Sequence, residues 1–313
     1  MATTHRTEHG VRVAAPVDQV YDLLADVGAW PWIFPPTVHA ERVDGDDTDE
    51  VIRLWASAGE TVKTWTSRRS LDRAAGRVTF RQEVPAHPVA AMGGEWLLAP
   101  DGAGGATVRL LHDFVAVDDD PANVEWITAA IDRNSEAELK ALRRIAELGP
   151  ALAEVVLTFD DSVVVAGLAT AAYEFINRAD LWPERLPHVQ RVEFTEPEPG
   201  LQVLEMDTRA VDGSVHTTRS IRVGQPPERI VYKQQVLPKL LTAHAGQWLF
   251  RQTDDGTVIT SRHTVAIARS KVREVLGAAA GVLDARDYVR DALGNNSRAT
   301  LKLAKEYAEG GVA

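Results

Sequence analysis

Apolar and polar residues alternate along much of the first half of this 313-residue chain. Side chains of a strand point alternately to opposite faces, so this period of two predicts an antiparallel sheet with one buried face. Turn residues separate the alternating runs, as a meander of hairpins requires. The predicted strands cover residues 11–14, 51–56, 62–70, 78–84, 95–98 and 107–115.

A long helical pattern follows the last of these strands. Asp120 can cap its N-terminus and Pro121 suits the first helical position, which predicts a helix to about Leu148. A second helical pattern covers residues 271–308, and Gly281 is expected to break it. A strand, short helices, an antiparallel sheet and one long closing helix are the order of a helix-grip α+β domain. In such a domain the curved sheet wraps the C-terminal helix and leaves an internal cavity.

The whole pattern occurs twice, because the chain repeats itself at a shift of 152 positions. Tyr21 recurs as Tyr173, and the pair Trp30-Pro31 recurs as Trp182-Pro183. A period of this length is that of a domain and exceeds the ~20–50 residues of solenoid repeats. We therefore expect two tandem domains, residues 1–150 and 151–313, and we look for each functional residue in both copies.

Composition excludes several classes of function. The chain has no cysteine, which rules out disulfides, thiolate metal sites and a cysteine nucleophile and suits a reducing cytoplasm. The net charge of −11 argues against a general nucleic-acid binder. The start lacks the apolar core of a signal peptide, and no apolar stretch approaches ~18 residues, so a cytoplasmic protein without membrane spans is expected. No phosphate-binding loop, dinucleotide motif or metal-ligand spacing occurs, which predicts chemistry without a cofactor or metal.

One predicted strand carries a candidate site. Trp65, Ser67 and Arg69 share one face of it, a combination that suits a cavity wall better than a dry core. The second copy places Ser220 and Arg222 in the same positions and lacks the tryptophan. The alternative is structural, with the arginine paired to a carboxylate at the rim of the sheet.

Further aromatic and polar residues recur in both copies. Trp30 and Trp182 line a pocket or anchor a turn, and Trp96 and Trp248 are core or cavity residues of a strand. Asn134 follows the apolar stripe of the first closing helix and needs a hydrogen bond or a ligand, and Asn296 is its counterpart. The histidines on apolar strand faces are interpreted as core residues before catalytic ones. They are His112, His244 and His263.

These residues together resemble the bacterial polyketide aromatase/cyclases, which are helix-grip (START-like) proteins of type II polyketide synthases. The resemblance rests on the opening pattern up to Tyr21, the Trp30-Pro31 turn, the strand from Trp65 to Arg69, Trp96 and Asn134. The duplication over nearly the whole chain resembles the di-domain subclass.

The resemblance implies an activity and a set of site residues. It implies first-ring aldol cyclisation and dehydration of a poly-β-ketone on an acyl carrier protein, together with other synthase components and without cofactor or metal. The implied catalytic residues are Ser67, Arg69, Ser220 and Arg222. The implied substrate-binding residues are Trp30, Phe34, Trp65, Trp96, Asn134, Trp182, Trp248 and Asn296.

The first copy keeps the Trp-Thr-Ser-Arg strand, so it is expected to fold and cyclise the substrate, while the second copy assists dehydration or braces the first. Carrier docking is expected beside Arg68 and Arg73, with Arg269, Lys271 and Arg273 as the alternative. A non-catalytic carrier of an apolar ligand and a scaffold with filled cavities are the competing interpretations.

Overall fold

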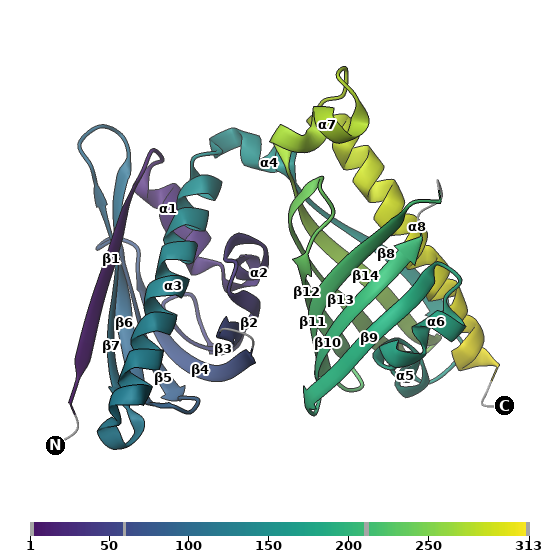
Figure 1. Cartoon of the computed structure of the whole chain (residues 1–313), viewed down its shortest axis with the longest axis horizontal. Coiled ribbons are helices and arrows are strands. Elements are labelled where there is room, and N and C mark those ends of the chain that lie inside the picture. Colours follow the sequence, from purple (N-terminus) through teal and green to yellow (C-terminus); the bar gives the residue numbers. More distant parts are fainter. Residues whose placement is uncertain (1–2, 59–60, 210–212, 311–313) are drawn as a thin grey trace. The chain divides into compact units, whose positions relative to one another are not determined.

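The computed structural model describes residues 3–58, 61–209 and 213–310. The chain divides into two compact units, Met1–Leu152 and Ala153–Ala313. Each unit is one antiparallel seven-stranded sheet with a long helix across it, so the expected tandem helix-grip architecture is confirmed (Figure 1).

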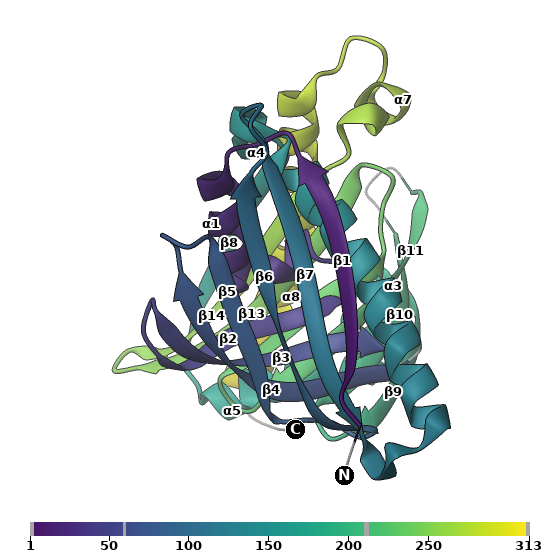
Figure 2. The ribbon, with the colours of Figure 1, turned by 90° about the vertical axis from the view of Figure 1, so that its left-hand side faces the viewer.

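The sheet of the first unit has the strand order β1-β7-β6-β5-β4-β3-β2, a meander closed by its first strand. Figure 2 shows β1, β7 and β6 side by side. The strands are β1 His5–Val13, β2 Thr37–Gly45, β3 Asp49–Ala58, β4 Thr61–Asp72, β5 Arg77–Val84, β6 Val89–Pro100 and β7 Ala106–Ala116. The helices are α1 Val17–Ala25, α2 Trp30–Ile33 and α3 Pro121–Ala146, with 3-10 turns η1 Val27–Ala29 and η2 Val117–Asp119.

The second unit repeats this plan with the strand order β8-β14-β13-β12-β11-β10-β9. It follows η3 Gly149–Ala151 and begins near α4 Leu152–Val155. Its strands are β8 Val156–Val165, β9 Val189–Glu198, β10 Leu201–Arg209, β11 Val215–Gln225, β12 Arg229–Val236, β13 Leu241–Thr253 and β14 Gly256–Ile267. Its helices are α5 Ala169–Asn177, α6 Trp182–Arg185, α7 Val272–Leu276 and α8 Val282–Glu309, with 3-10 turns η4 Ala179–Leu181 and η5 Arg269–Lys271.

The closing helices follow the sequence-based prediction. Asp120 caps α3 by accepting a hydrogen bond from the Ala122 backbone at 2.8 Å, and Pro121 takes the first helical position. The second closing helix is broken between α7 and α8, where Gly277 has a φ of 99° and Gly281 caps α8. Both predictions about these helices are confirmed.

The opening strand of the first unit is longer than predicted, and β2 was missed. The prediction relied on apolar alternation, but the half-buried face of β1 carries His5, Thr7 and His9. Their backbone is satisfied by an unbroken ladder to β7, which requires no apolar side chains. Pairing with β7, and not the residues' own pattern, extends this strand.

The long helix of the first unit buries its apolar stripe against the sheet. Leu139, Leu142 and Ile145 pack in one cluster with Val108 and Leu110 of β7. Each fully buried side chain of this kind contributes about 1.5–3 kcal/mol to folding. The second unit has a corresponding cluster that includes Leu301 and Ala304 of α8.

Candidate active site

The second unit contains a cavity of about 880 Å³ between its sheet and the helices α6, α7 and α8. All five site residues that the sequence pointed to in this unit line the cavity. They are Trp182, Ser220, Arg222, Trp248 and Asn296. Apolar residues such as Leu204 and Met206 make up much of the remaining wall. A concave, largely apolar space with a few polar groups is what a small-molecule site requires.

Arg222 is the buried cation of this cavity, with only 2% of the residue exposed to solvent, and Lys239 lines the cavity from an exposed position. Its Nη2 donates to the Ile176 carbonyl at 2.7 Å, and its guanidinium lies over the Trp182 ring at 5.0 Å. Its Nη1 makes no hydrogen bond. Burial lowers the pKa of Arg222 to about 10, so the side chain stays charged at neutral pH.

Arg69 of the first unit is held in the same way. Its Nη2 donates to the Leu24 carbonyl at 2.8 Å, and its guanidinium lies over the Trp30 ring at 4.9 Å. Its Nη1 also lies 2.9 Å from a carboxylate oxygen of Glu50 on β3, and both residues are buried. The carboxylate partner that the sequence left open as an alternative is therefore present, in the interior and not at the rim.

A hydrogen-bonded network centred on His263 lines the cavity of the second unit. The Nδ1 of His263 lies 2.9 Å from the Tyr232 hydroxyl and 2.9 Å from Nε2 of His244. Its Nε2 lies 2.7 Å from the Ser297 hydroxyl of α8, which is itself 3.1 Å from the hydroxyl of Ser261. Three strands and one helix supply these side chains.

The imidazoles of this network are neutral at pH 7. Burial lowers the pKa of His263 to about 4 and holds the pKa of His244 well below its usual range. Burial raises the pKa of the Tyr232 phenol. Nδ1 of His263 lies within hydrogen-bonding distance of Tyr232 and His244, and Nε2 lies within hydrogen-bonding distance of Ser297, so the ring joins both sides of the network whichever nitrogen carries the proton. Such a chain can pass a proton along itself.

Tyr232 has room for its phenol because residue 246 is glycine. A Cβ at Gly246 would collide with the Tyr232 hydroxyl and would lie 2.6 Å from the Arg262 carbonyl oxygen. The glycine thus lets the phenol lie across β13 and reach His263.

The first unit lacks this network. At the register positions of Tyr232, His244 and Ser261 it has Phe80, Met92 and Leu110. His112 occupies the position of His263, and its buried Nδ1 has no hydrogen-bond partner. Burial lowers the pKa of His112 to about 4 as well, so it is a neutral histidine at pH 7, and its ring lies edge-on to that of Phe80. The interpretation of His112 as a core residue stays a prediction.

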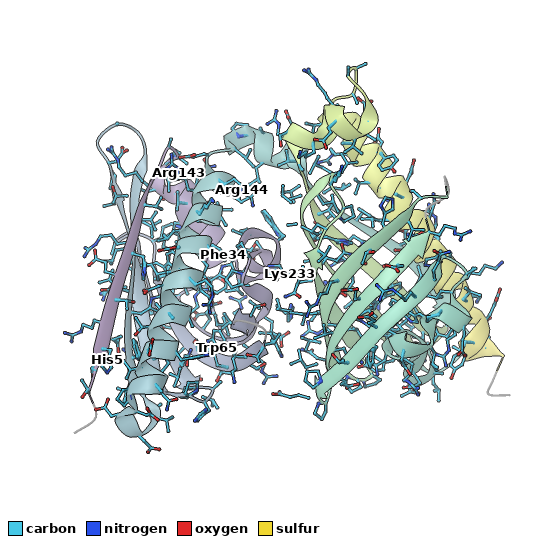
Figure 3. The ribbon with its side chains drawn as sticks, in the orientation of Figure 1. His5, Phe34, Trp65, Arg143, Arg144 and Lys233 are labelled. Carbon is cyan, nitrogen blue, oxygen red and sulfur yellow. The ribbon has the colours of Figure 1, made fainter. Side chains whose placement is uncertain are left out.

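The predicted site residues of the first unit are packed among apolar side chains. Phe34 stacks on Trp96 with ring centroids 6.3 Å apart, and both are buried in the core cluster. Trp65 is half-buried against a second cluster (Figure 3). Asn134 donates to the Ser57 carbonyl at 3.4 Å, so the hydrogen bond that its position required is present. Ser67 is buried with Arg69 on β4.

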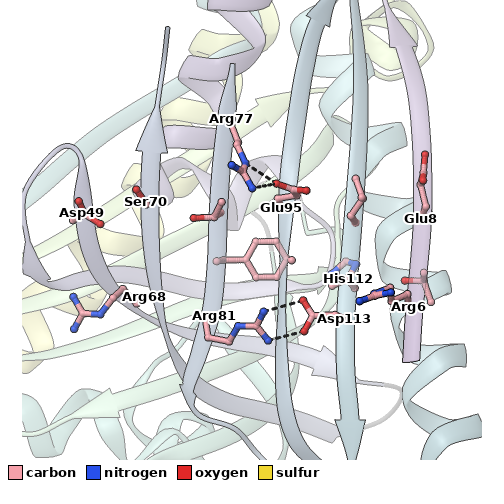
Figure 4. A pocket seen from close by; sticks show the side chains of 15 residues that line it. Arg6, Glu8, Asp49, Arg68, Ser70, Arg77, Arg81, Glu95, His112 and Asp113 are labelled. Atoms are coloured by element: carbon pink, nitrogen blue, oxygen red, sulfur yellow. Dashed lines mark hydrogen bonds and ion pairs between the residues drawn. The ribbon is translucent and has the colours of Figure 1, made fainter. Parts of the chain in front are cut away.

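A polar groove on the outer side of the first sheet is crossed by ion pairs (Figure 4). Arg81 makes two hydrogen bonds to Asp113 at 2.7 and 2.9 Å, and Arg77 donates to Glu95 at 2.6 Å. Arg68, one of the expected docking residues, also lines this groove and lies 2.9 Å from Glu83. Arg73, the other one, donates to Asp22 at 2.5 Å.

Sequence reasoning selected the arginine, serine, tryptophan and asparagine of the second cavity and missed Tyr232. It interpreted His244 and His263 as core residues. A signal was present: at three positions the second copy has a polar residue where the first has an apolar one. These pairs are Phe80 and Tyr232, Met92 and His244, and Leu110 and Ser261.

Within residues 3–58, 61–209 and 213–310, no group of three or more His, Asp or Glu side chains is arranged to hold a metal ion. In the same part of the chain, no helix is both long and apolar enough to cross a membrane.

Two family models, both described as polyketide cyclase / dehydrase and lipid transport, match residues 4–147 and 168–291. The chain is 47% identical to the granaticin polyketide synthase bifunctional cyclase/dehydratase of Streptomyces violaceoruber, over 98% of this chain and 95% of that protein. It is 46% identical to the actinorhodin polyketide synthase bifunctional cyclase/dehydratase of Streptomyces coelicolor, over 96% of each.

Two solved structures are similar over the full length of the chain. The di-domain ARO/CYC BexL from the BE-7585A biosynthetic pathway is 51% identical, with a TM-score of 0.88 over 97% of this chain and 99% of that one. The di-domain ARO/CYC StfQ from the steffimycin biosynthetic pathway is 39% identical, with a TM-score of 0.87 over 98% of this chain and 100% of that one.

Proposed function

Because this chain belongs to the di-domain aromatase/cyclases of bacterial type II polyketide synthases, we propose that it closes and aromatises the first ring of a carrier-bound poly-β-ketone. The cavity of the second unit supplies the reacting groups, and no cofactor takes part. One observation carries this assignment: Arg222 and the His263 network line the same cavity of about 880 Å³.

The substrate class explains why a shaped cavity is the main requirement. A poly-β-ketone has acidic methylene groups between its carbonyls and can close in several registers. The protein therefore has to hold one folded conformation more than it has to supply a strong base. Trp182 and Trp248 offer flat apolar surface for the folded chain and for the planar ring that forms from it.

Ring closure builds negative charge that Arg222 can stabilise. An enolate carbon attacks a ketone carbonyl, a carbon–carbon bond forms, and the carbonyl oxygen becomes an alkoxide. A fixed guanidinium with a free Nη1 stabilises the enolate and then the alkoxide. Losing one such contact costs on the order of 3 kcal/mol, or ~10²-fold in rate. Ser220, buried on the same strand and part of the cavity wall, is a further polar contact.

Dehydration needs a proton carrier, and Arg222 is a poor one because it stays protonated. The new hydroxyl leaves as water after gaining a proton, while the neighbouring carbon loses one. Neutral His263, hydrogen-bonded to Tyr232 and Ser297, can accept a proton on one side of the network and release one on the other. This network is the group that the first unit does not have.

The catalytic roles of Ser67 and Arg69 stay predictions. Arg69 is ion-paired with Glu50, and the first unit has Phe80 and Met92 where the second has Tyr232 and His244, so these differences favour a folding and binding role for the first unit. Other synthase components make the polyketide chain, and it arrives as a thioester on an acyl carrier protein. The absence of cysteine suits work in the cytoplasm.

Reconstitution with a minimal polyketide synthase tests the proposal. We expect Arg222→Met to lower the ring-closed aromatic product by ~10²-fold. The matched variant of the first unit is Glu50→Gln with Arg69→Met, which removes both charges together and leaves no unpaired buried ion. It is expected to keep the product.

The opposite result, loss in the double variant and retention in Arg222→Met, assigns the chemistry to the first unit. Product ratios that match those of reactions without the protein would support the competing carrier interpretation, in which the cavity only holds an apolar ligand.

A further inference from the structure

The two units hold their buried arginine in nearly the same way but differ in the residue opposite it. Arg69 and Arg222 each donate to a helix carbonyl and each lie over a tryptophan ring about 5 Å away. The register partner of Arg69 on the neighbouring strand is Glu50, and that of Arg222 is Gln202. The repeat therefore contains an exchange of a carboxylate for an amide at one position.

In the first unit the carboxylate compensates the arginine. Glu50 is 4% exposed, Arg69 is 2% exposed, and an oxygen of the first lies 2.9 Å from Nη1 of the second. In a buried environment such a pair largely cancels its own field. A ligand anion that approaches Arg69 therefore also meets the negative charge of Glu50.

In the second unit the amide has a fixed partner of its own. Gln202 is 1% exposed, and its Nε2 donates to the Asn177 side-chain oxygen at 3.0 Å. The first unit has Ala25 at the position of Asn177, so the amide and its partner occur together in one copy only. Among the described residues, no carboxylate makes an ion pair with Arg222 or a hydrogen bond to its Nη1, and Glu196 acts on this side chain only from a greater distance.

We infer that Gln202 determines the charge preference of the second cavity: by leaving Arg222 uncompensated, it makes this cavity select an anionic ligand group, which the first unit does not. An unpaired cation removed from water attracts an anion much more strongly than a solvated one does. The expected ligand is a planar, delocalised oxyanion, which can contact the Trp182 ring and Nη1 of Arg222 at the same time. Gln202 itself is a positioning residue, because it does not line the cavity.

This inference rests on the proposed function for the identity of the natural anion, an enolate of the polyketide. Its own claim concerns binding, so a probe that does not react can test it. The probe pair is 2-naphthoate and its neutral isostere 2-naphthamide, which differ in charge and hardly in shape. Binding to the full-length protein is measured by calorimetry and by quenching of tryptophan fluorescence.

We expect 2-naphthoate to bind the native protein at least ~10-fold more tightly than 2-naphthamide. Gln202→Glu supplies the missing carboxylate and should abolish this preference without weakening 2-naphthamide, whose retained binding shows that the cavity is folded. Gln190→Glu adds the same charge at an exposed position of β9 and should keep the preference. Arg222→Met should abolish it.

Two outcomes overturn the inference: equal affinity of the native protein for both probes, or an unchanged preference in Gln202→Glu. If Gln202→Glu does not fold, an unchanged preference in Arg222→Met also overturns the inference. A preference that behaves as expected in a protein that forms no cyclised product would leave the inference intact and refute the proposed function.

Discussion

Replacing His263 with asparagine is expected to slow dehydration far more than ring closure. His263 contacts Tyr232, His244, Ser261 and Ser297 at 2.7–3.2 Å. Asparagine is polar but too short to contact both sides of this network, so proton transfer through it is interrupted. The substitution keeps Arg222 and removes no charge at pH 7, because the pKa of His263 is about 4.

The size of the effect follows from the contacts that are lost. General acid–base groups contribute about 10²–10⁴ in rate, so dehydration should fall by ~10²-fold or more. The Ser297 and Tyr232 hydroxyls lose a partner, which costs about 1–3 kcal/mol for each group left unsatisfied. The variant should therefore be less stable but folded. Ring closure, which depends on the charge of Arg222, should change little.

The assay is a single-turnover reaction with carrier-bound polyketide that is stopped with acid. The masses of its products distinguish the ring-closed alcohol from the dehydrated arene. The alcohol should accumulate in His263→Asn. The matched variant His112→Asn alters the corresponding histidine of the first unit, which has no such network, and should give the native product profile. Native dehydration rates in a folded His263→Asn protein would refute the role assigned to this network.

Three further predictions concern ionisable side chains. Because burial lowers the pKa of His263 to about 4, the unfolded chain binds a proton at this histidine between pH ~6.5 and 4 that the folded chain does not, so the folded protein loses stability as the pH falls through this range. Between pH 7 and 5, the free energy of unfolding measured in urea should fall by about 2 kcal/mol more for the native protein than for His263→Asn. Arg69→Ala leaves buried Glu50 with only the half-exposed Arg42 at 3.9 Å as an ion-pair partner and should destabilise the first unit by about 3 kcal/mol, whereas Arg222→Ala leaves no buried carboxylate of this kind; equal losses in denaturant unfolding would contradict this difference. The side chains of Arg68 and Arg73 are 57% and 52% exposed despite their ion pairs, so Arg68→Glu with Arg73→Glu should weaken carrier binding at low salt, and an unchanged affinity without salt dependence would rule out this docking site.

Local patterns predicted most of the fold. Alternation located β3, β4, β5 and β7, since one face of each is more buried than the other, although Val51 and Trp55 on the second face of β3 are buried too. The start of α3 was located from Asp120 and Pro121. The full length of β1 was not predicted, because its inner face is polar and pairing with β7 alone extends it.

The site was predicted less completely, for a related reason. Alternation places Ser220 and Arg222 on one face of a strand whatever that strand packs against, and both line the cavity. The sequence could not indicate whether the arginine was already paired. That depends on the register of the next strand, which brings Glu50 to Arg69 and Gln202 to Arg222.

The sequence by itself determined the duplication, the two helix-grip domains, and the strand face that carries the serine and the arginine, because these follow from periodicity and from matches along the chain. Only the tertiary structure decided which copy has hydrogen-bonded side chains that can transfer a proton. Tyr232, His244, His263 and Ser297 lie on β12, β13, β14 and α8, and they meet only when the sheet curves around the helix. Within its own strand, a lone histidine on an apolar face looks the same whether its neighbours across the sheet are Phe80 and Met92 or Tyr232 and His244. What distinguishes the two is packing across strands, which no local pattern encodes.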